Sequence, residues 1–201
     1  PTVADIIAAI DEDTKAIMVP NLIGNKPDWA GLEAELQRIG RTDIYVIEDS
    51  ADTLGAKIGT KSTGYFSDIS ITSFYGSHII NCAGNGGALL LNDPKAINKA
   101  KLLRSWGRSS SLFDEKSEEI ENRFNINLQG IDYDAKFVFE ELGYQLEPSE
   151  ISAAFALVQF NKLEKNMELR NKHFDSHLQF LSKYSQFFSL PKQNPKAYTC
   201  W

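Results

Sequence analysis

The sequence predicts an α/β fold built on a mostly parallel β-sheet. A strand pattern at residues 14–19, a helical pattern at 27–38 and a strand pattern at 44–47 follow one another directly. Such a strand–helix–strand unit closes by a right-handed crossover, so its two strands are expected to be parallel. The alternating run at 68–73 and the apolar run at 88–91 indicate two further strands, the second of them buried.

The first half of the chain carries recognisable start and stop signals for its elements. Residues 3–10 form an amphipathic helical pattern, and Pro20 ends the strand at 14–19. Asp28 is placed to cap the helix at 27–38, and Gly40 is placed to end it. Residues 52–63 contain few bulky apolar side chains, which predicts a loop or a small hairpin.

The second half contains two predicted helices separated by a polar stretch. A helix is expected at 94–106, because Asp93 is a good cap and Pro94 suits the first turn. Residues 108–133 show no clear period and predict a long functional or mobile surface loop. A long helix begins near Glu150 and runs on to Tyr184, with or without a kink.

This element order predicts three parts. Residues 1–148 belong to a large domain, 149–184 form a connecting helix, and 185–201 begin a smaller C-terminal domain. The first residue is not Met, and the sequence stops on an aromatic, strand-like run. We therefore interpret the chain as an internal fragment of a longer protein.

Composition excludes several functional classes. There are 21 Lys and Arg against 27 Asp and Glu, with no basic block, which argues against nucleic-acid binding. The sequence has neither a signal-peptide pattern nor an apolar run long enough to span a membrane, so we expect a soluble, cytoplasmic protein. Cys82 and Cys200 do not form a disulfide framework or a metal-binding spacing.

The most informative stretch is the connection between the strands at 68–73 and 88–91. It contains His78 and the glycine cluster at 84–87. A lone loop histidine is usually structural or solvated, so its neighbours decide what it does. Asp49 is one such neighbour, because it follows the strand at 44–47 and ligands bind at the carboxyl ends of strands in α/β folds.

Several segments resemble, in order and spacing, the motifs of one family. These are EDSADTLGA at 48–56, SDISITSFY at 67–75, GNGG at 84–87 and LRSWGR at 103–108. They are similar to the patterns of the sugar-nucleotide aminotransferases and dehydratases of the DegT/DnrJ/EryC1/StrS type. The resemblance covers residues 1–184. It implies the aspartate-aminotransferase-like fold (fold type I) and the cofactor pyridoxal phosphate (PLP) or its amine form, pyridoxamine phosphate.

The resemblance also implies roles for individual residues. Asp49 would pair with the pyridine nitrogen of the cofactor, and a protonated ring nitrogen makes that ring an electron sink. Asp52 would lie at the cofactor, and Ser73 would bind its phosphate. Most members carry, five residues after this serine, a lysine that bonds the cofactor. This chain has His78 there, which can move a proton but cannot form that bond.

A histidine at this position marks the lysine-less 3-dehydratases, which act on GDP-4-keto-6-deoxymannose or CDP-4-keto-6-deoxyglucose. The segments LIGN at 22–25 and GYQL at 143–146 resemble theirs, with Gln145 in place of an Asn that reaches the cofactor phosphate of the neighbouring subunit. The resemblance therefore implies a homodimer. Arg108 is a candidate substrate-binding residue, since Arg is a natural phosphate partner.

The CDP-sugar enzyme of this branch also holds an iron–sulfur cluster on four cysteines. Three of those positions are Ala51, Ser109 and Ser111 here, and these side chains cannot replace thiolates. We therefore expect no iron–sulfur cluster. His173 and His177 lie four residues apart, a spacing that can bind a metal, but no further ligand is near them in the sequence. We interpret them as surface residues.

The resulting hypothesis is a PLP-family 3-dehydratase of a nucleotide-linked 4-keto-6-deoxyhexose, with His78 as the proton-transfer group and glutamate as an amino donor. Its setting would be deoxysugar and lipopolysaccharide O-antigen biosynthesis. One alternative is an aminotransferase that uses Lys57 or Lys61. Another is a non-catalytic paralogue, favoured by the departures at Gln145 and Asn85.

Overall fold

The computed structural model describes residues 1–113, 116, 119–191 and 197–198. The chain divides into two compact units, which are described separately. The first contains residues 1–90 and 150–201, and the second contains residues 91–149. The predicted start of a C-terminal domain falls partly outside the described residues, and the three-part division stays a prediction.

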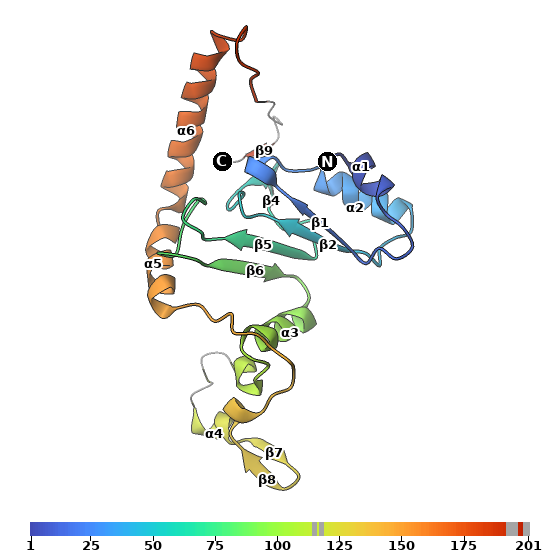
Figure 1. Cartoon of the computed structure of the whole chain (residues 1–201), viewed down its shortest axis with the longest axis vertical. Helices are drawn as coiled ribbons and strands as arrows, with labels where there is room; N and C mark the ends of the chain where they lie inside the picture. The colour runs from blue at the N-terminus through green and yellow to red at the C-terminus, as the bar shows by residue number, and fades with distance from the viewer. Residues whose placement is uncertain (114–115, 117–118, 192–196, 199–201) are drawn as a thin grey trace. The chain divides into compact units, whose positions relative to one another are not determined.

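The first unit contains a four-stranded sheet of β1 (Ala16–Pro20), β2 (Tyr45–Asp49), β5 (Ile69–Ser73) and β6 (Gly87–Leu91). The strand order is β1-β2-β5-β6. The pairs β1–β2 and β2–β5 are parallel, and the arrows of β5 and β6 point in opposite directions in Figure 1. The predicted mostly parallel sheet is therefore confirmed.

Two helices cover one face of this sheet, α1 (Val3–Ala8) and α2 (Trp29–Arg38) (Figure 1). Asp28 caps α2 as expected, because its side chain accepts a hydrogen bond from the Gly31 amide. The first helix stops two residues earlier than predicted. The core joins apolar residues of both helices and of the first two strands: Ile6, Ile17, Val19, Trp29, Leu32, Leu36, Ile44 and Val46.

The segment predicted as a loop or a small hairpin contains a hairpin of β3 (Lys57–Ile58) and β4 (Lys61–Ser62). A short strand β9 (Ala197–Tyr198) pairs antiparallel with β3. Between β1 and α2 the chain makes a single 3₁₀ turn, η1 (Leu22–Gly24), in which Ile23 has left-handed dihedral angles (φ 54°, ψ 40°).

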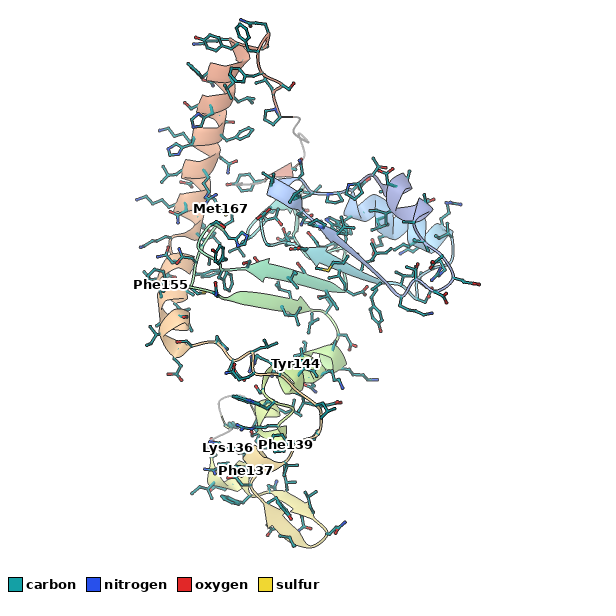
Figure 2. All side chains as sticks on the ribbon, viewed as in Figure 1. Lys136, Phe137, Phe139, Tyr144, Phe155 and Met167 are labelled. Carbon is teal, nitrogen blue, oxygen red and sulfur yellow. The ribbon has the colours of Figure 1, made fainter. Side chains whose placement is uncertain are left out.

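The predicted long helix is two helices, α5 (Glu150–Phe160) and α6 (Leu163–Ser182). α6 packs through Met167 against the segments that follow β2 and β5, and Met167 lies on this helix in Figure 2. Met167 is buried with Ile79, and Leu54 and Leu163 pack against them. Within the described ranges, no helix is long and apolar enough to cross a membrane.

The expectation that residues 88–91 form a buried strand is half wrong. The strand exists, but Leu89 is 51% exposed and Leu90 is 49% exposed. β6 is the edge strand of the described sheet, and its apolar side chains are not covered by the elements described. An apolar run therefore predicted the strand correctly but not its burial in this chain.

The second unit contains α3 (Pro94–Arg104), η2 (Ser109–Leu112), α4 (Ile120–Arg123), β7 (Ile126–Leu128), β8 (Ile131–Tyr133) and η4 (Ala135–Phe137). Asp93 caps α3 through the Lys95 amide, as predicted. The expectation of a long loop at 108–133 is wrong, because β7 and β8 form an antiparallel hairpin. Its two turn residues, Gln129 and Gly130, both have positive φ, as a tight hairpin turn requires.

Candidate active site

His78 lies in the loop that follows β5, and backbone hydrogen bonds fold this loop tightly. The His78 amide donates to the Tyr75 carbonyl, and the Tyr75 amide donates to the Ser73 hydroxyl. The base of the loop is closed where the Phe74 amide donates to the Gly86 carbonyl. The imidazole is largely buried, with its side chain 18% exposed. The loop thus presents His78 in a fixed and shielded position.

Asp52 is the charged partner of His78. The Asp52 Oδ1 atom lies 3.4 Å from His78 Nε2, and the Asp52 side chain is 17% exposed. Its other oxygen, Oδ2, accepts a hydrogen bond of 2.9 Å from the Ile23 amide. The carboxylate therefore bridges the η1 turn and the imidazole. The resemblance to the family implies that Asp52 lies at the cofactor, and that role stays a prediction.

Asp49 and Ser73 end two adjacent parallel strands. Asp49 closes β2 and lies opposite Ile71 of β5, while Ser73 is the last residue of β5. One carboxylate oxygen of Asp49 accepts a hydrogen bond from the Ala51 amide. Among the described residues, no donor reaches its second oxygen. Both side chains can therefore accept further partners at the carboxyl edge of the sheet, where α/β folds bind ligands.

A buried polar cluster beneath this edge was missed in the sequence. Glu48 alternates with Asp49 along β2, so its side chain enters the interior. Its Oε1 accepts a hydrogen bond of 2.6 Å from Asn21 Nδ2, and its Oε2 accepts one of 2.7 Å from the Gly64 amide. The signal was available, because Glu48 is in phase with the core residue Val46.

Lys26 completes the cluster. Its Nζ lies 3.8 Å from Glu48 Oε1 and donates to the Thr63 hydroxyl, and its side chain is 3% exposed. Burial lowers the pKa of Lys26, and the nearby Glu48 carboxylate opposes that shift. Asn21 binds the indole N–H of Trp29 through its Oδ1. The cluster thus ties the start of η1 to the sheet and to α2.

Arg108 and Gln145 belong to the second unit, whereas His78 belongs to the first. Within that unit their two segments pair in an antiparallel arrangement, with bridges from Ser105 to Gln145 and from Arg108 to Phe139. The Arg108 guanidinium lies 4.4 Å from the ring centroid of Trp106. Gln145 is exposed.

The structure gives no support for a metal centre in the part of the chain that it describes. No group of three or more possible ligands occurs there. Cys82 is buried, which raises the pKa of its thiol and makes it a poor ligand and nucleophile at neutral pH. His173 and His177 lie on α6, and Cys200 falls outside the described residues.

Comparison with known proteins identifies the family. Residues 1–201 match the DegT/DnrJ/EryC1/StrS aminotransferase family along their whole length. The chain belongs to this family. The resemblance drawn from the motifs at 48–56, 67–75, 84–87 and 103–108 is therefore confirmed.

Two relatives from this family match nearly all of the chain. The lipopolysaccharide biosynthesis protein RfbH of Salmonella typhimurium is 31% identical over 199 residues, which cover 98% of this chain and 44% of the relative. The dTDP-4-dehydro-2,6-dideoxy-D-glucose 3-dehydratase of Saccharopolyspora spinosa is 30% identical over 198 residues, which cover 98% and 42%. The chain thus spans less than half the length of these curated relatives.

Solved structures confirm the fold type I aminotransferase architecture. An aminotransferase from Psychrobacter cryohalolentis superposes with a TM-score of 0.80 at 22% identity, covering 99% of this chain and 48% of that one. The Escherichia coli GDP-4-keto-6-deoxy-D-mannose 3-dehydratase with bound hydrated PLP superposes with a TM-score of 0.72 at 24% identity, covering 99% and 48%. At these identities the likeness establishes the fold of this member of the family.

Proposed function

We propose that this chain is part of a PLP-family 3-dehydratase that removes the 3-hydroxyl of a nucleotide-linked 4-keto-6-deoxyhexose. The observation that carries the proposal is the shielded imidazole of His78, which lies against the Asp52 carboxylate in the loop where most family members carry a lysine. An imidazole titrates near neutral pH and can both take up and return a proton. Relatives named as 3-dehydratases support this reading.

The residues at the carboxyl edge of the sheet fit the cofactor. Asp49 offers a carboxylate oxygen to a protonated ring nitrogen, and the Ser73 hydroxyl can donate to a phosphate. When bound in its amine form, the cofactor supplies a nitrogen that reacts with the 4-keto group and a ring that accepts an electron pair. Asp49 keeps the ring nitrogen protonated, which makes that acceptance favourable.

His78 would move one proton in two steps. Its imidazole would take the proton at the C4′ carbon of a bound cofactor and give the same proton to the departing 3-hydroxyl, which would leave as water. One group can serve both steps because the uptake and the return of this proton follow one another. The burial of His78 favours this role, since few water molecules compete for the proton.

Residues of the second unit complete the proposal. We assign Arg108 to the phosphates of the nucleotide sugar, since a guanidinium matches phosphate geometry. We assign Gln145 to the cofactor phosphate of a neighbouring subunit in a homodimer, and glutamate as the donor that regenerates the amine. The place of the reaction would be deoxysugar and lipopolysaccharide biosynthesis, as the name of the Salmonella relative suggests.

An aminotransferase is the second candidate, favoured by the family name and by the Psychrobacter structure. It requires a lysine at the cofactor. Neither candidate in the sequence belongs to the β5–β6 loop: Lys57 lies in β3, and Lys61 lies in β4 with its Nζ 3.7 Å from the Tyr65 ring centroid. Lys26 is buried with Glu48. The dehydratase is therefore the better-supported function.

The test uses the full-length protein with PLP and glutamate. We expect free, non-covalent cofactor that converts to the amine form, no adduct trapped on a lysine by borohydride, and turnover of a 4-keto-6-deoxyhexose nucleotide. His78→Ala should lower that turnover by about 10²–10⁴-fold, the usual contribution of a proton-transfer group. His173→Ala, on α6, is the matched control and should leave turnover unchanged. A lysine adduct would favour the aminotransferase, and failure to bind cofactor would favour the non-catalytic paralogue.

A further inference from the structure

We propose that Asp52 is the positioning residue of His78 and that it fixes the imidazole as the Nε2–H tautomer. This inference rests on the proposed function for its catalytic consequence. All the contacts that support it lie within the first unit. A negative oxygen 3.4 Å from Nε2 favours a proton on that nitrogen, which leaves the lone pair on Nδ1.

The Asp52 carboxylate is itself held in place. Its Oδ2 accepts the Ile23 amide at 2.9 Å, so only Oδ1 faces His78. Ile23 has φ 54° and ψ 40°, a left-handed conformation that a β-branched residue rarely adopts. Such strain persists only where the surroundings impose it, and it often accompanies a functional site. Here the strained backbone is the one that directs the amide of residue 23 at Asp52.

The buried cluster supplies the constraint on this turn. The Asn21 amide donates to the Asp49 carbonyl, and the Asn21 side chain donates to Glu48, Ser50 and Thr53. Asn21 also accepts the Gly24 amide through its carbonyl, which closes the turn. These buried groups thus hold the turn that positions the Ile23 amide.

α6 holds the two segments that carry Asp52 and His78. Leu54 and Ile79 lie two residues after Asp52 and one residue after His78, and both pack against Met167. Gly55 allows this approach, since a Cβ atom there would lie 2.6 Å from the Met167 sulfur. The contact between carboxylate and imidazole is therefore fixed by the η1 turn on one side and by α6 on the other.

This arrangement has a chemical consequence. Nδ1 of His78 is buried, so water does not compete with Asp52 in setting the tautomer. Once the imidazole takes up a proton, the imidazolium lies next to the Asp52 carboxylate, which stabilises its charge. Asp52 thus acts through His78 and has no need to touch the substrate.

The test compares Asp52→Asn with Asp68→Asn in the full-length protein. Asp68 is the matched control, because its carboxylate also accepts a backbone amide, that of Val46, but does not contact His78. The first readout is the ¹⁵N NMR spectrum of the histidine rings in cofactor-free protein, with the His78 signals assigned from His78→Gln. We expect the Nε2–H tautomer in the native protein and in Asp68→Asn, and its loss in Asp52→Asn.

The second readout is turnover. In Asp52→Asn we expect kcat to fall by about 10- to 100-fold, a part of the about 10²–10⁴-fold that a proton-transfer group supplies, with KM changed less than about threefold. Asp52→Glu, which keeps the charge, should recover part of the loss. An Nδ1–H tautomer in the native protein, or an unchanged tautomer in Asp52→Asn, would overturn the inference whatever the activity.

The two proposals fail in different ways. If the native protein shows the expected tautomer but turns over no 4-keto sugar, the proposed function fails and the positioning of His78 stands. If His78→Ala abolishes turnover while Asp52→Asn leaves kcat and the tautomer unchanged, the function stands and the role of Asp52 is wrong. A fall in kcat of equal size in Asp68→Asn would also count against Asp52, because it would indicate a general effect on folding.

Discussion

Asn21 and Glu48 form a buried hydrogen bond of 2.6 Å across the β1–β2 edge, between an amide nitrogen and a carboxylate oxygen. Both residues are 1% exposed. Glu48 uses its two oxygens for two different donors, Asn21 and the Gly64 amide. A group with two acceptor oxygens is therefore required here, and this requirement can be tested.

We expect Glu48→Gln to lower the free energy of unfolding by about 2–3 kcal/mol, since glutamine has one acceptor oxygen and its NH₂ group would face a buried donor. Glu35→Gln is the matched control. Glu35 forms a surface pair with Arg38, and such exposed pairs contribute little to stability. Urea unfolding of both variants measures the difference. Equal losses in the two variants would show that the buried acceptor is not needed.

The burial of Lys26, the partner of Glu48, predicts that the free energy of unfolding depends on pH. Burial lowers the pKa of Lys26 from its ordinary value of 10.5. Between the lowered value and 10.5 the unfolded chain binds more protons at this group than the folded chain does, so the contribution of Lys26 to stability rises with pH in that window. Below the window the unfavourable contribution is constant.

The measurement compares native protein with Lys26→Gln, which has no titratable group at this position. The native protein should gain stability relative to the variant as pH rises through the alkaline window. A flat difference between the two unfolding free energies across that range would show that burial does not shift Lys26. A difference that falls with pH would show that pairing with Glu48 outweighs burial.

The contact of α6 with the segments that follow β2 and β5 depends on Met167. We expect Met167→Ala to lower the free energy of unfolding by about 2–3 kcal/mol, because it removes a buried side chain and leaves a cavity beside Leu54 and Ile79. Met18 is the matched control, since it is the only other methionine and is 57% exposed. Met18→Ala should cost about 0.5 kcal/mol or less. Thermal unfolding distinguishes the two, and similar shifts would argue against the α6 contact.

The parts of the fold that were predictable depend on local pattern. The β1–α2–β2 unit and the caps Asp28 and Asp93 follow from periodicity and from side chains that bond their own neighbours. The hairpin turn at Gln129–Gly130 has a local signal as well, and reading residues 108–133 as a loop overlooked it. The burial of β6 has no such local signal, because exposure depends on which elements lie against a strand.

The candidate site shows the same contrast between features with a local sequence signal and features set by contacts distant in sequence. Asp49, Ser73 and His78 were predicted as site residues from motifs that lie along the sequence, and their roles stay predictions. The contact between Asp52 and His78 was not, since it depends on the left-handed backbone of Ile23 and on the approach of Met167, both distant in sequence from the pair they support. Glu48 was overlooked because it was grouped with its neighbour Asp49 at the end of the strand. Its side chain instead lies on the same side of β2 as the buried Val46.

The conformation of Ile23 gives a prediction that can raise stability. We expect Ile23→Asn to increase the free energy of unfolding by about 0.5–1 kcal/mol, because asparagine tolerates left-handed dihedral angles that cost other residues about 1–2 kcal/mol. The side chain is exposed, so little apolar contact is lost. Leu22→Asn, one residue earlier and equally exposed, is the control and should bring no gain. A loss in Ile23→Asn would mean that residue 23 is not left-handed in solution.

Substituting Gly107 and Gly130 by Ala distinguishes two costs in the second unit: backbone strain at positive φ, and steric overlap of the added Cβ atom. Both have positive φ, 79° and 86°. A Cβ atom on Gly107 would lie 1.9 Å from the Glu141 carbonyl oxygen, whereas one on Gly130 would meet nothing within 4 Å. Gly130→Ala should therefore cost about 1–2 kcal/mol from the backbone alone. Gly107→Ala should cost more, because the paired segments that carry Arg108 and Gln145 must separate.

Hydrogen exchange at the Trp106 amide, which donates to the Tyr144 carbonyl, reports that separation. Faster exchange in Gly107→Ala and not in Gly130→Ala is the expected result, and equal exchange in both variants would contradict the close pairing of the two segments.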